Sequence, residues 1–494
     1  MVNIIQRLLI SVVILGLMGC SLTLTDQQLN SKGSSPSPVA ASPIPNQTIL
    51  ILLSTSQPPG VNITPQVSEA GTPPNNVFGM TLYRFDETGG LLKAAEAGTA
   101  WSRKDFFWSR IEPSPGERLW DVDLEQELIN LSSYNVQPVM IIGSTPGWAL
   151  KNGFNCGAVA EDQFPTLAQF TYDLVKRYSV PPYNVRYWEL WNEPDASGLL
   201  GCWGDPSDTQ YYGGYYYGKM LQTVYPRIKE ADPSAQVMVG GLLLDCDPND
   251  PPEGKSCLSS NFLMGILESG GGPYFDGVSF HAYDFYFGEE VYGNGNWHSS
   301  SSTTGPVSIV KANFLRNVLS EYGYKEKYLM NTEMAVFWGP NVINPPCGAT
   351  PEEMPPVEET KVNYVIHSYA VAVAEGWKAS IWYSAIGVRC SGLLNIDLSP
   401  KGSYYAYQFT EQKLSGAIFV NAIDEYEGVM GYEFETADRR LVVIWSMDGL
   451  SRTLILPRLP LEVNQIGGDG RAVQELNSLN LTLQDSPLFI EFEQ

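Results

Sequence analysis

Apolar runs alternate with amphipathic segments along the middle of the chain, from about residue 77 to residue 412. Short runs of the kind that form buried strands begin at Val77, Trp101, Val136, Asn184, Ala235, Gly277, Lys327 and Ala379. The segments between them carry apolar residues at helical spacing, such as Leu167, Phe170 and Leu174. Eight strands separated by helices predict an α/β fold, a (β/α)8 TIM barrel of parallel strands. Asp123 is expected to cap the helix before the third strand.

The pattern changes near Ala417, where short segments with alternating apolar and polar residues follow one another. Turn signals such as MDG and GGDG separate these segments, and helical periodicity is lacking. This pattern predicts a small all-β sandwich after the barrel. We therefore assign residues 76–412 to the barrel and residues 413–494 to the sandwich.

The N-terminal segment has the pattern of an export signal. Arg7 precedes the apolar run Leu8–Met18, which is too short to span a bilayer comfortably. The tetrad LMGC, which ends at Cys20, resembles a bacterial lipobox, in which the cysteine is lipidated. Residues 1–20 are thus predicted to be a lipoprotein signal peptide, and the Ser/Pro-rich residues 21–75 a tether. An ordinary signal peptide or a short anchor is the alternative.

The composition narrows the range of partners and locations. The 494 residues include 30 Lys+Arg and 54 Asp+Glu, which gives a formal net charge of −24. Such a surface repels a phosphate backbone, so nucleic acid and anionic lipid are excluded as partners. We expect an extracytoplasmic protein that meets a membrane only through the lipid on its N-terminal cysteine.

The cysteines suggest disulfide bonds. Of 7 cysteines, all except Cys20 remain for pairing: Cys156, Cys202, Cys246, Cys257, Cys347 and Cys390. Six cysteines allow 15 pairings. The strand order places neighbouring cysteines in neighbouring loops, which suggests 156–202, 246–257 and 347–390. A mixture of free buried thiols is the alternative.

Two glutamates follow predicted strands on the same face of the barrel. The fourth strand ends in Trp191-Asn192-Glu193-Pro194, and the seventh ends in Asn331-Thr332-Glu333. The carboxyl ends of barrel strands form the face that carries chemistry. Two carboxylates that face each other there are what retaining glycoside hydrolysis requires. The alternative is that each glutamate is only an ion-pair partner or is solvated.

These segments resemble the clan A glycoside hydrolases. WELWNEPD is similar to their acid/base motif, and the spacing of 333 − 193 = 140 residues suits their two glutamates. TPGWA and FDGVSFHAY strengthen the resemblance, which is greatest to family 39 and its family 5-like relatives and covers residues 77–494. The resemblance implies that Glu193 is the acid/base and Glu333 the nucleophile.

The same resemblance implies roles for three polar residues. Arg103 would lie near Glu333 and favour its ionised form. Asn192 would bind the 2-hydroxyl of the sugar. Tyr283 would donate a hydrogen bond to the nucleophile. In the family the nucleophile segment often reads T-E-x-G, whereas here Glu333 is followed by Met334. The loop after the nucleophile therefore differs from the family pattern, and the sugar-binding subsites that it would form stay undefined.

Three ring residues are further candidates for contact with substrate. His281 lies on the same face of its strand as the tyrosine two residues later, and the resemblance places it beside the substrate. Trp382 would be the floor under the sugar, and Trp148 would line the cleft. The alternatives are a satisfied core position for His281 and Trp382, and loop packing for Trp148.

No motif for a metal or cofactor occurs. The chain has 3 His and lacks HExxH, Walker A and CxxC motifs, so we expect neither. The leading hypothesis is a retaining hydrolase of β-linked extracellular glycans. One alternative is a non-catalytic carbohydrate-binding lipoprotein on the same fold, and another is a solute-binding lipoprotein that feeds an importer.

Overall fold

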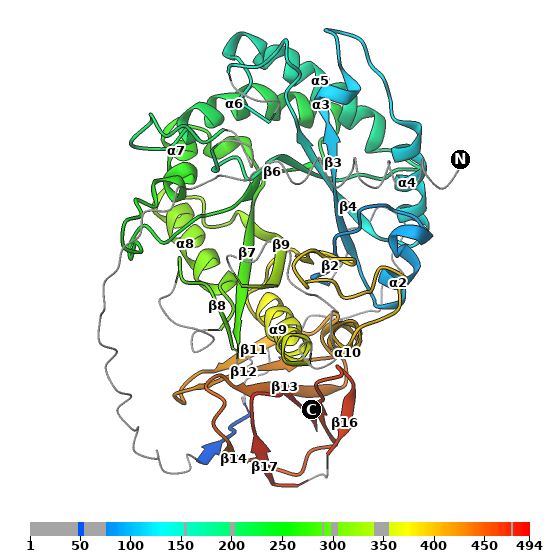
Figure 1. The fold of residues 1–494 in the computed structure, drawn as a ribbon, viewed down its shortest axis with the longest axis vertical. Coiled ribbons are helices and arrows are strands. Elements are labelled where there is room, and N and C mark those ends of the chain that lie inside the picture. The colour runs from blue at the N-terminus through cyan, green and yellow to red at the C-terminus, as the bar shows by residue number, and fades with distance from the viewer. Residues whose placement is uncertain are drawn as a thin grey trace, which may run out of the picture. The chain divides into compact units, whose positions relative to one another are not determined.

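Eight parallel strands form a closed barrel (Figure 1). In chain order they are β2 (Phe78–Met80), β3 (Trp101–Phe107), β4 (Gln137–Gly143), β5 (Tyr187–Asn192), β6 (Gln236–Leu242), β7 (Gly277–Gly288), β9 (Tyr328–Trp338) and β10 (Ser380–Trp382). Each strand pairs with its neighbours in the chain, and pairings of β10 with β2 and of β6 with β7 close the ring. The predicted barrel is confirmed. The structure is a computed structural model that describes residues 48–53, 76–152, 156–197, 203–288, 291–297, 305–339, 355–475 and 478–494.

Helices connect the strands. They are α2 (Leu91–Glu96), α3 (Trp108–Ile111), α4 (Val122–Ser133), α5 (Phe164–Tyr178), α6 (Gly214–Ala231), α7 (Phe262–Glu268), α8 (Ser308–Glu321), α9 (Pro355–Ala374) and α10 (Gly402–Leu414). Short 3-10 turns are η1 (Glu87–Gly89), η2 (Glu161–Gln163), η3 (Leu258–Asn261) and η4 (Gly272–Tyr274). The expected cap of α4 was wrong. Asp121, not Asp123, accepts hydrogen bonds from two backbone N–H groups of the first turn.

The barrel interior is filled in layers. An apolar cluster occupies the end where the strands begin and consists of Trp101, Val139, Tyr187, Met238, Met330, Ala379 and Ile381. Inward side chains recur every second residue, so the next layer toward the carboxyl ends includes Arg103, Glu189 and Thr332. The interior therefore changes from apolar to charged along the barrel axis, and the mouth of the barrel lies above the charged layer.

Strand β8 (Val291–Gly293) forms a hairpin with β7, and a two-sheet β-domain follows the barrel. Its strands are β11 (Ile418–Ile423), β12 (Val429–Glu435), β13 (Arg439–Ser446), β14 (Arg452–Ile455), β15 (Glu462–Ile466), β16 (Ala472–Gln474), β17 (Asn480–Leu483) and β18 (Leu488–Glu493). Six strands form one sheet in the order β11-β12-β13-β18-β15-β16, and a second sheet has the order β1-β14-β17. Apolar side chains from both sheets share one core, as a sandwich requires. The predicted C-terminal β-domain is confirmed.

One strand of the sandwich comes from the predicted tether, so that assignment was wrong for residues 48–53. Strand β1 (Thr48–Leu50) pairs in parallel with β14. Ile49 and Ile51 are buried in the sandwich core, which is why this short segment is held in place. The predicted boundary at residue 412 also falls inside α10, which continues to the buried Leu414.

The rest of the predicted signal and tether, including Cys20, lies outside the described residues. Within the described part of the chain, no helix has both the length and the apolar character that crossing a membrane requires.

Candidate active site

Glu193 and Glu333 meet at the mouth of the barrel. Glu193 follows the last residue of β5, and Glu333 lies on β9 beside His281 of β7 in the sheet register. One side-chain ligand atom from each of the three residues lies within 4.8 Å of the others. Both glutamates are largely buried, with 9% and 8% of their surface exposed. The structure thus brings together the two carboxylates that the sequence singled out.

The backbone at the end of β5 is held in an unusual conformation. Trp191 has φ of 69° and Glu193 has φ of 45°, in the left-handed region that side chains other than glycine rarely adopt. The indole nitrogen of Trp191 donates to the carbonyl of Cys156 at 2.9 Å, and the amide of Glu193 donates to the carbonyl of Gly241 at 3.0 Å. These bonds fix the direction in which the Glu193 side chain leaves the strand.

Glu333 receives a hydrogen bond on each carboxylate oxygen. Arg103 Nη1 donates to Oε1, and the hydroxyl of Tyr283 donates to Oε2. The Tyr283 ring stacks on Phe337 with centroids 4.6 Å apart, which fixes its position. Arg103 and Tyr283 therefore lie where the family resemblance implied, with both donors directed at the carboxylate.

Arg103 is itself held by two further acceptors. Its Nε donates to Glu189 at 2.6 Å, and its Nη2 donates to the Asn192 side-chain oxygen at 2.8 Å. Burial alone would lower the pKa of Arg103, but the charges of Glu189 and Glu333 raise it above its usual value. The side chain remains a cation beneath the carboxylates and orients Asn192 at the same time.

Glu189 is a functional residue that the sequence reasoning missed. It is fully buried and also accepts hydrogen bonds from Ser279 Oγ at 2.6 Å and Thr332 Oγ1 at 3.0 Å. A carboxylate at an inward position of an otherwise apolar strand was the signal that could have found it. Buried charges occur in proteins mainly when they are paired in this way.

Glu193 has a different environment. Burial raises its pKa to about 7, although the positive charges of Arg103 and Lys311 oppose the rise. Its Oε1 shares a hydrogen bond of 2.9 Å with His281 Nδ1, an atom that also lies 3.6 Å from Glu333 Oε2. His281 therefore lies between the two carboxylates.

His281 is a neutral group at physiological pH. Burial lowers its pKa to about 4, so the ring is uncharged when Glu193 titrates. Gly241 provides the space for the ring, because a Cβ at that position would lie 2.1 Å from His281 Nε2. A neutral imidazole can donate a hydrogen bond to the ionised Glu193 carboxylate or accept one from the protonated carboxyl group.

A buried lysine supports this histidine, and the sequence reasoning missed it as well. Lys311 of α8 is 4% exposed, and its Nζ donates to the carbonyls of Leu243 at 2.6 Å and His281 at 2.9 Å. Asp195 binds the backbone amides of Leu243 and Leu244, each at 2.8 Å, so the loop after β6 is fixed from two sides. Burial raises the pKa of Asp195 to about 7 and lowers the pKa of Lys311 to about 8.

The prediction that Trp382 is the sugar floor was wrong. Trp382 is fully buried, and its indole nitrogen donates to the carbonyl of Ser391 at 2.9 Å, so its ring has no face open to a sugar. Tyr383, the next residue, is half-buried and contacts the Tyr283 ring edge-on at 6.3 Å. Burial raises the pKa of Tyr383 above its usual value, and the charge of Glu333 adds to the rise.

Trp148 packs in the loop after β4, which favours the structural alternative. Its indole nitrogen donates to the carbonyl of Pro113 at 3.1 Å, and its ring meets Trp108 edge-on at 5.5 Å. These contacts hold Trp148 against α3 and the segment that follows it.

In the described ranges, Glu193, His281 and Glu333 are the one group close enough to suggest a metal site. Both oxygens of Glu333 already accept hydrogen bonds, and one donor is the Arg103 cation. A divalent ion would have to displace these donors, so the three residues do not fit a metal centre.

The structure contains the disulfide Cys246–Cys257, one of the three pairs that the sequence suggested. Cys156 and Cys390 are each disulfide-bonded as well. Their suggested partners, Cys202 and Cys347, lie outside the described residues.

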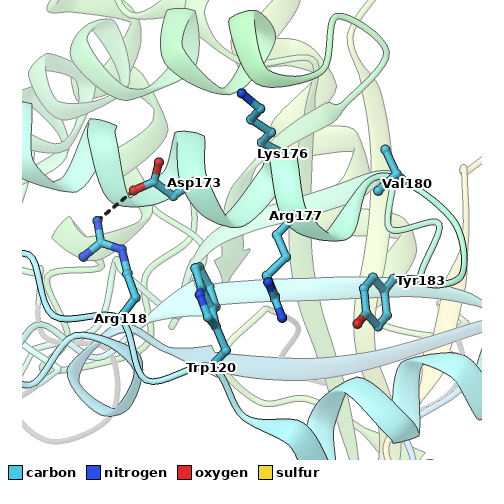
Figure 2. Close-up of a pocket in the computed structure, with 7 residues that line it drawn as sticks. All are labelled: Arg118, Trp120, Asp173, Lys176, Arg177, Val180 and Tyr183. Carbon is cyan, nitrogen blue, oxygen red and sulfur yellow. Dashed lines mark hydrogen bonds and ion pairs between the residues drawn. The ribbon is translucent and has the colours of Figure 1, made fainter.

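A pocket of about 520 Å³ lies away from the carboxylates, between α5 and the segment before α4 (Figure 2). Both of its arginines are ion-paired, Arg118 with Asp173 at 3.1 Å and Arg177 with Glu125 at 2.6 Å. Trp120 lies between the two arginines (Figure 2), with the Arg177 guanidinium 4.9 Å from its ring centre.

No model of a protein family matches the sequence, and no curated protein matches it. Solved structures do resemble the fold. A family 39 glycoside hydrolase from the gut symbiont Bacteroides cellulosilyticus WH2 has a TM-score of 0.64 at 18% identity, with 87% of this chain and 83% of that chain covered. A family 39 β-xylosidase from Caulobacter crescentus has a TM-score of 0.54 at 16% identity, covering 86% and 98%. A family 30 endoxylanase from Clostridium papyrosolvens C71 has a TM-score of 0.56 at 12% identity, covering 85% and 96%. The predicted resemblance to clan A glycoside hydrolases is therefore confirmed at the level of the fold.

Proposed function

We propose that this protein is a retaining glycoside hydrolase that cleaves β-linked O-glycosidic bonds of oligo- or polysaccharides. The observation that carries the proposal is the pair of buried carboxylates, with an oxygen of one within 4.8 Å of an oxygen of the other. Carboxyl groups about 5–5.5 Å apart leave room for direct attack on the sugar, whereas inverting enzymes hold them about 6.5–9.5 Å apart to admit a water. The short separation favours retention.

The surroundings of the two glutamates support a different role for each. Glu333, which accepts hydrogen bonds from Arg103 and Tyr283, attacks the anomeric carbon and forms the glycosyl-enzyme. Glu193 protonates the departing oxygen in this first step. In the second step Glu193 removes a proton from water, which then releases the sugar from Glu333 with net retention.

The pKa of Glu193 suits both of its tasks. With a value of about 7, the side chain can hold a proton for the first step and accept one in the second near neutral pH. The neutral His281 beside it can follow this change without competing for the proton. A mobile proton on Glu193 is what the double displacement requires.

Two further groups are available to the sugar. The Asn192 side-chain oxygen is occupied by Arg103, which leaves its amide nitrogen to donate to the 2-hydroxyl. Tyr383 takes the place that the sequence had given to Trp382, since its half-buried ring lies next to Tyr283.

For the cell, we propose an extracytoplasmic lipoprotein whose partner is a carbohydrate substrate and which is anchored through Cys20. The support is the LMGC tetrad and the net charge of −24. A Cys20→Ser variant should move from the membrane fraction to the soluble extracytoplasmic fraction. Continued membrane association would reject the anchor.

The proposed reaction is tested by the stereochemistry of hydrolysis. A panel of p-nitrophenyl β-glycosides should identify a substrate, and proton NMR should show the β-anomer as the first product. Glu333→Gln should abolish turnover. Glu491→Gln is a matched control, because Glu491 is equally buried and ion-paired, with Lys413 and Arg439, but lies in the sandwich. An α-anomer as first product, or full activity of Glu333→Gln, would reject the mechanism, and glycan binding without turnover would favour the non-catalytic alternative.

A further inference from the structure

A cleft of about 530 Å³ opens at the carboxyl end of β3, between the loop after β2 and the start of α4. We call it the rim cleft. Its lining includes Arg84, Asp105, Phe107, Arg110, Leu119 and Trp120. Because the carboxyl ends of the strands form the catalytic face, the rim cleft belongs to the same face as the two glutamates.

The inner end of the rim cleft adjoins the catalytic cluster. Asp105 lies two residues beyond Arg103 on β3, so both side chains point to the same side of the sheet. The carboxyl of Asp105 is close enough to feel the charges of Arg103 and Glu189, although burial is the larger influence and raises its pKa. A ligand in the cleft would therefore reach the mouth of the barrel next to Arg103.

A series of tyrosines leads in the same direction. Tyr283, which donates to Glu333, contacts Tyr383 edge-on at 6.3 Å. Tyr383 in turn contacts Tyr83 edge-on, also at 6.3 Å. Tyr83 is 45% exposed and immediately precedes Arg84 of the cleft lining. These rings thus form a row from Tyr283 beside Glu333 to the exposed Tyr83, the residue before Arg84 of the rim cleft.

The lining suits a neutral sugar better than an anion. Arg84 is paired with Asp86 at 2.7 Å, and Arg110 faces Asp121 at 3.5 Å. The cations are thus balanced by acids and offer hydrogen bonds without a net positive field. Phe107, which is 42% exposed, adds an apolar surface of the kind that packs against the C–H face of a pyranose.

We propose that the rim cleft, together with Tyr83, binds the sugars that precede the cleaved bond, so that the substrate is a chain of neutral sugars. The inference rests on the proposed function. The sugar attached to Glu333 belongs to the half of the substrate that stays on the enzyme, while the leaving half departs on the side of Glu193. Trp120 lines both the rim cleft and the pocket of Figure 2, so the two hollows share this residue.

The test uses p-nitrophenyl glycosides of one, two and three sugar units, built from the sugar that the wild-type protein cleaves. In the wild type, kcat/KM should rise about tenfold from one to two units, which corresponds to about 1.4 kcal/mol of added binding in the transition state. Tyr83→Ala should remove most of this gain. Tyr134→Ala is the matched control, since Tyr134 is 39% exposed at the opposite end of α4, and it should keep the gain.

A second variant guards against loss of folding in the first. Arg110 is largely exposed, so Arg110→Trp should fold and should fill the rim cleft. It should lower kcat/KM for the longer substrates more than for the single sugar. Equal rates for one, two and three units in the wild type, or a gain that survives both variants, would overturn the inference and leave the proposed function intact. Absence of hydrolysis by the wild type across the whole panel of p-nitrophenyl β-glycosides would reject the proposed function itself.

Discussion

The two glutamates at the barrel mouth are nearly equal in exposure and yet have opposite surroundings. Glu333 is contacted directly by the Arg103 cation and by the Tyr283 hydroxyl. Glu193 is contacted by His281, a ring that is neutral at physiological pH, and feels Arg103 and Lys311 only as more distant charges. Burial is therefore not what distinguishes the two carboxyls; the groups on neighbouring strands are.

The proposed roles of the two glutamates rest on this difference. One carboxyl is surrounded by donors that match its ionised form. The other is placed where a proton can bind and leave near neutral pH, since its pKa is raised to about 7. Under this assignment, substitutions at or near Glu193 and substitutions near Glu333 should change kcat/KM in different ways.

The largest contrast is expected from the leaving group. Glu193→Gln should lower kcat/KM by about 10²- to 10⁴-fold for a poor leaving group such as an alkyl alcohol, because general acid catalysis contributes that much. For 2,4-dinitrophenol, which departs without a proton, the loss should be small. Rates for a series of aglycones of increasing pKa measure this. A loss that is the same for all leaving groups would show that Glu193 is not the acid.

A smaller effect is expected from the phenol beside Glu333. Tyr283→Phe removes one hydrogen bond to a charged group, worth about 1.5–3 kcal/mol, so kcat/KM should fall about 10- to 100-fold for every leaving group. Tyr225→Phe is the matched control, because Tyr225 also donates to a carboxylate, that of Asp276, at 3.0 Å, outside the site. Thermal unfolding should separate loss of stability from loss of rate. Equal losses in the two variants would count against a role for Tyr283 at the nucleophile.

The smallest effect is expected from Lys311, and it appears as a shift in the pH profile. Because Glu193 must be protonated to act as an acid, kcat/KM should fall as pH rises through the pKa of Glu193, about 7. The charge of Lys311 lowers this pKa. Lys311→Met should therefore move the alkaline limb of the kcat/KM profile to higher pH, by roughly half a pH unit to one pH unit.

The control for this shift is Lys361→Met. Lys361 is fully buried and likewise donates to two carbonyls, those of Cys390 at 3.0 Å and Gly392 at 2.8 Å. Its replacement removes a similar cation and should leave the alkaline limb in place. An unshifted limb in Lys311→Met would mean that the lysine only holds the backbone of His281.

The barrel and the glutamate pair could be predicted because their signals are local. Most of the strands are short apolar runs, and Glu193 directly follows one of them while Glu333 lies within another. Arg103 and Tyr283 were found only through the resemblance to a known family, and the structure places both against Glu333.

The remaining residues depend on contacts that are distant in the sequence. Lys311 lies on a helix, where a lysine is ordinarily exposed, and its burial arises from packing of α8 against the loop after β6. Trp382 and Tyr383 differ by one position, and the end of a short strand does not reveal which of two neighbours faces the mouth. For β1, the three strand residues stand in a polar, proline-rich segment, and they are stabilised by contacts that are distant in the sequence, namely pairing with β14 and burial in the sandwich core.

That first strand also determines how mechanical load enters the protein. Any pull on the chain before Thr48 is transmitted through hydrogen bonds between two parallel strands, β1 and β14, which are loaded in shear. Among the described residues, the sandwich is therefore the first part of the fold that such a force reaches. Removing the chain up to residue 75 would unload this connection, and it would also expose the edge of β14 and take Ile49 and Ile51 out of the core.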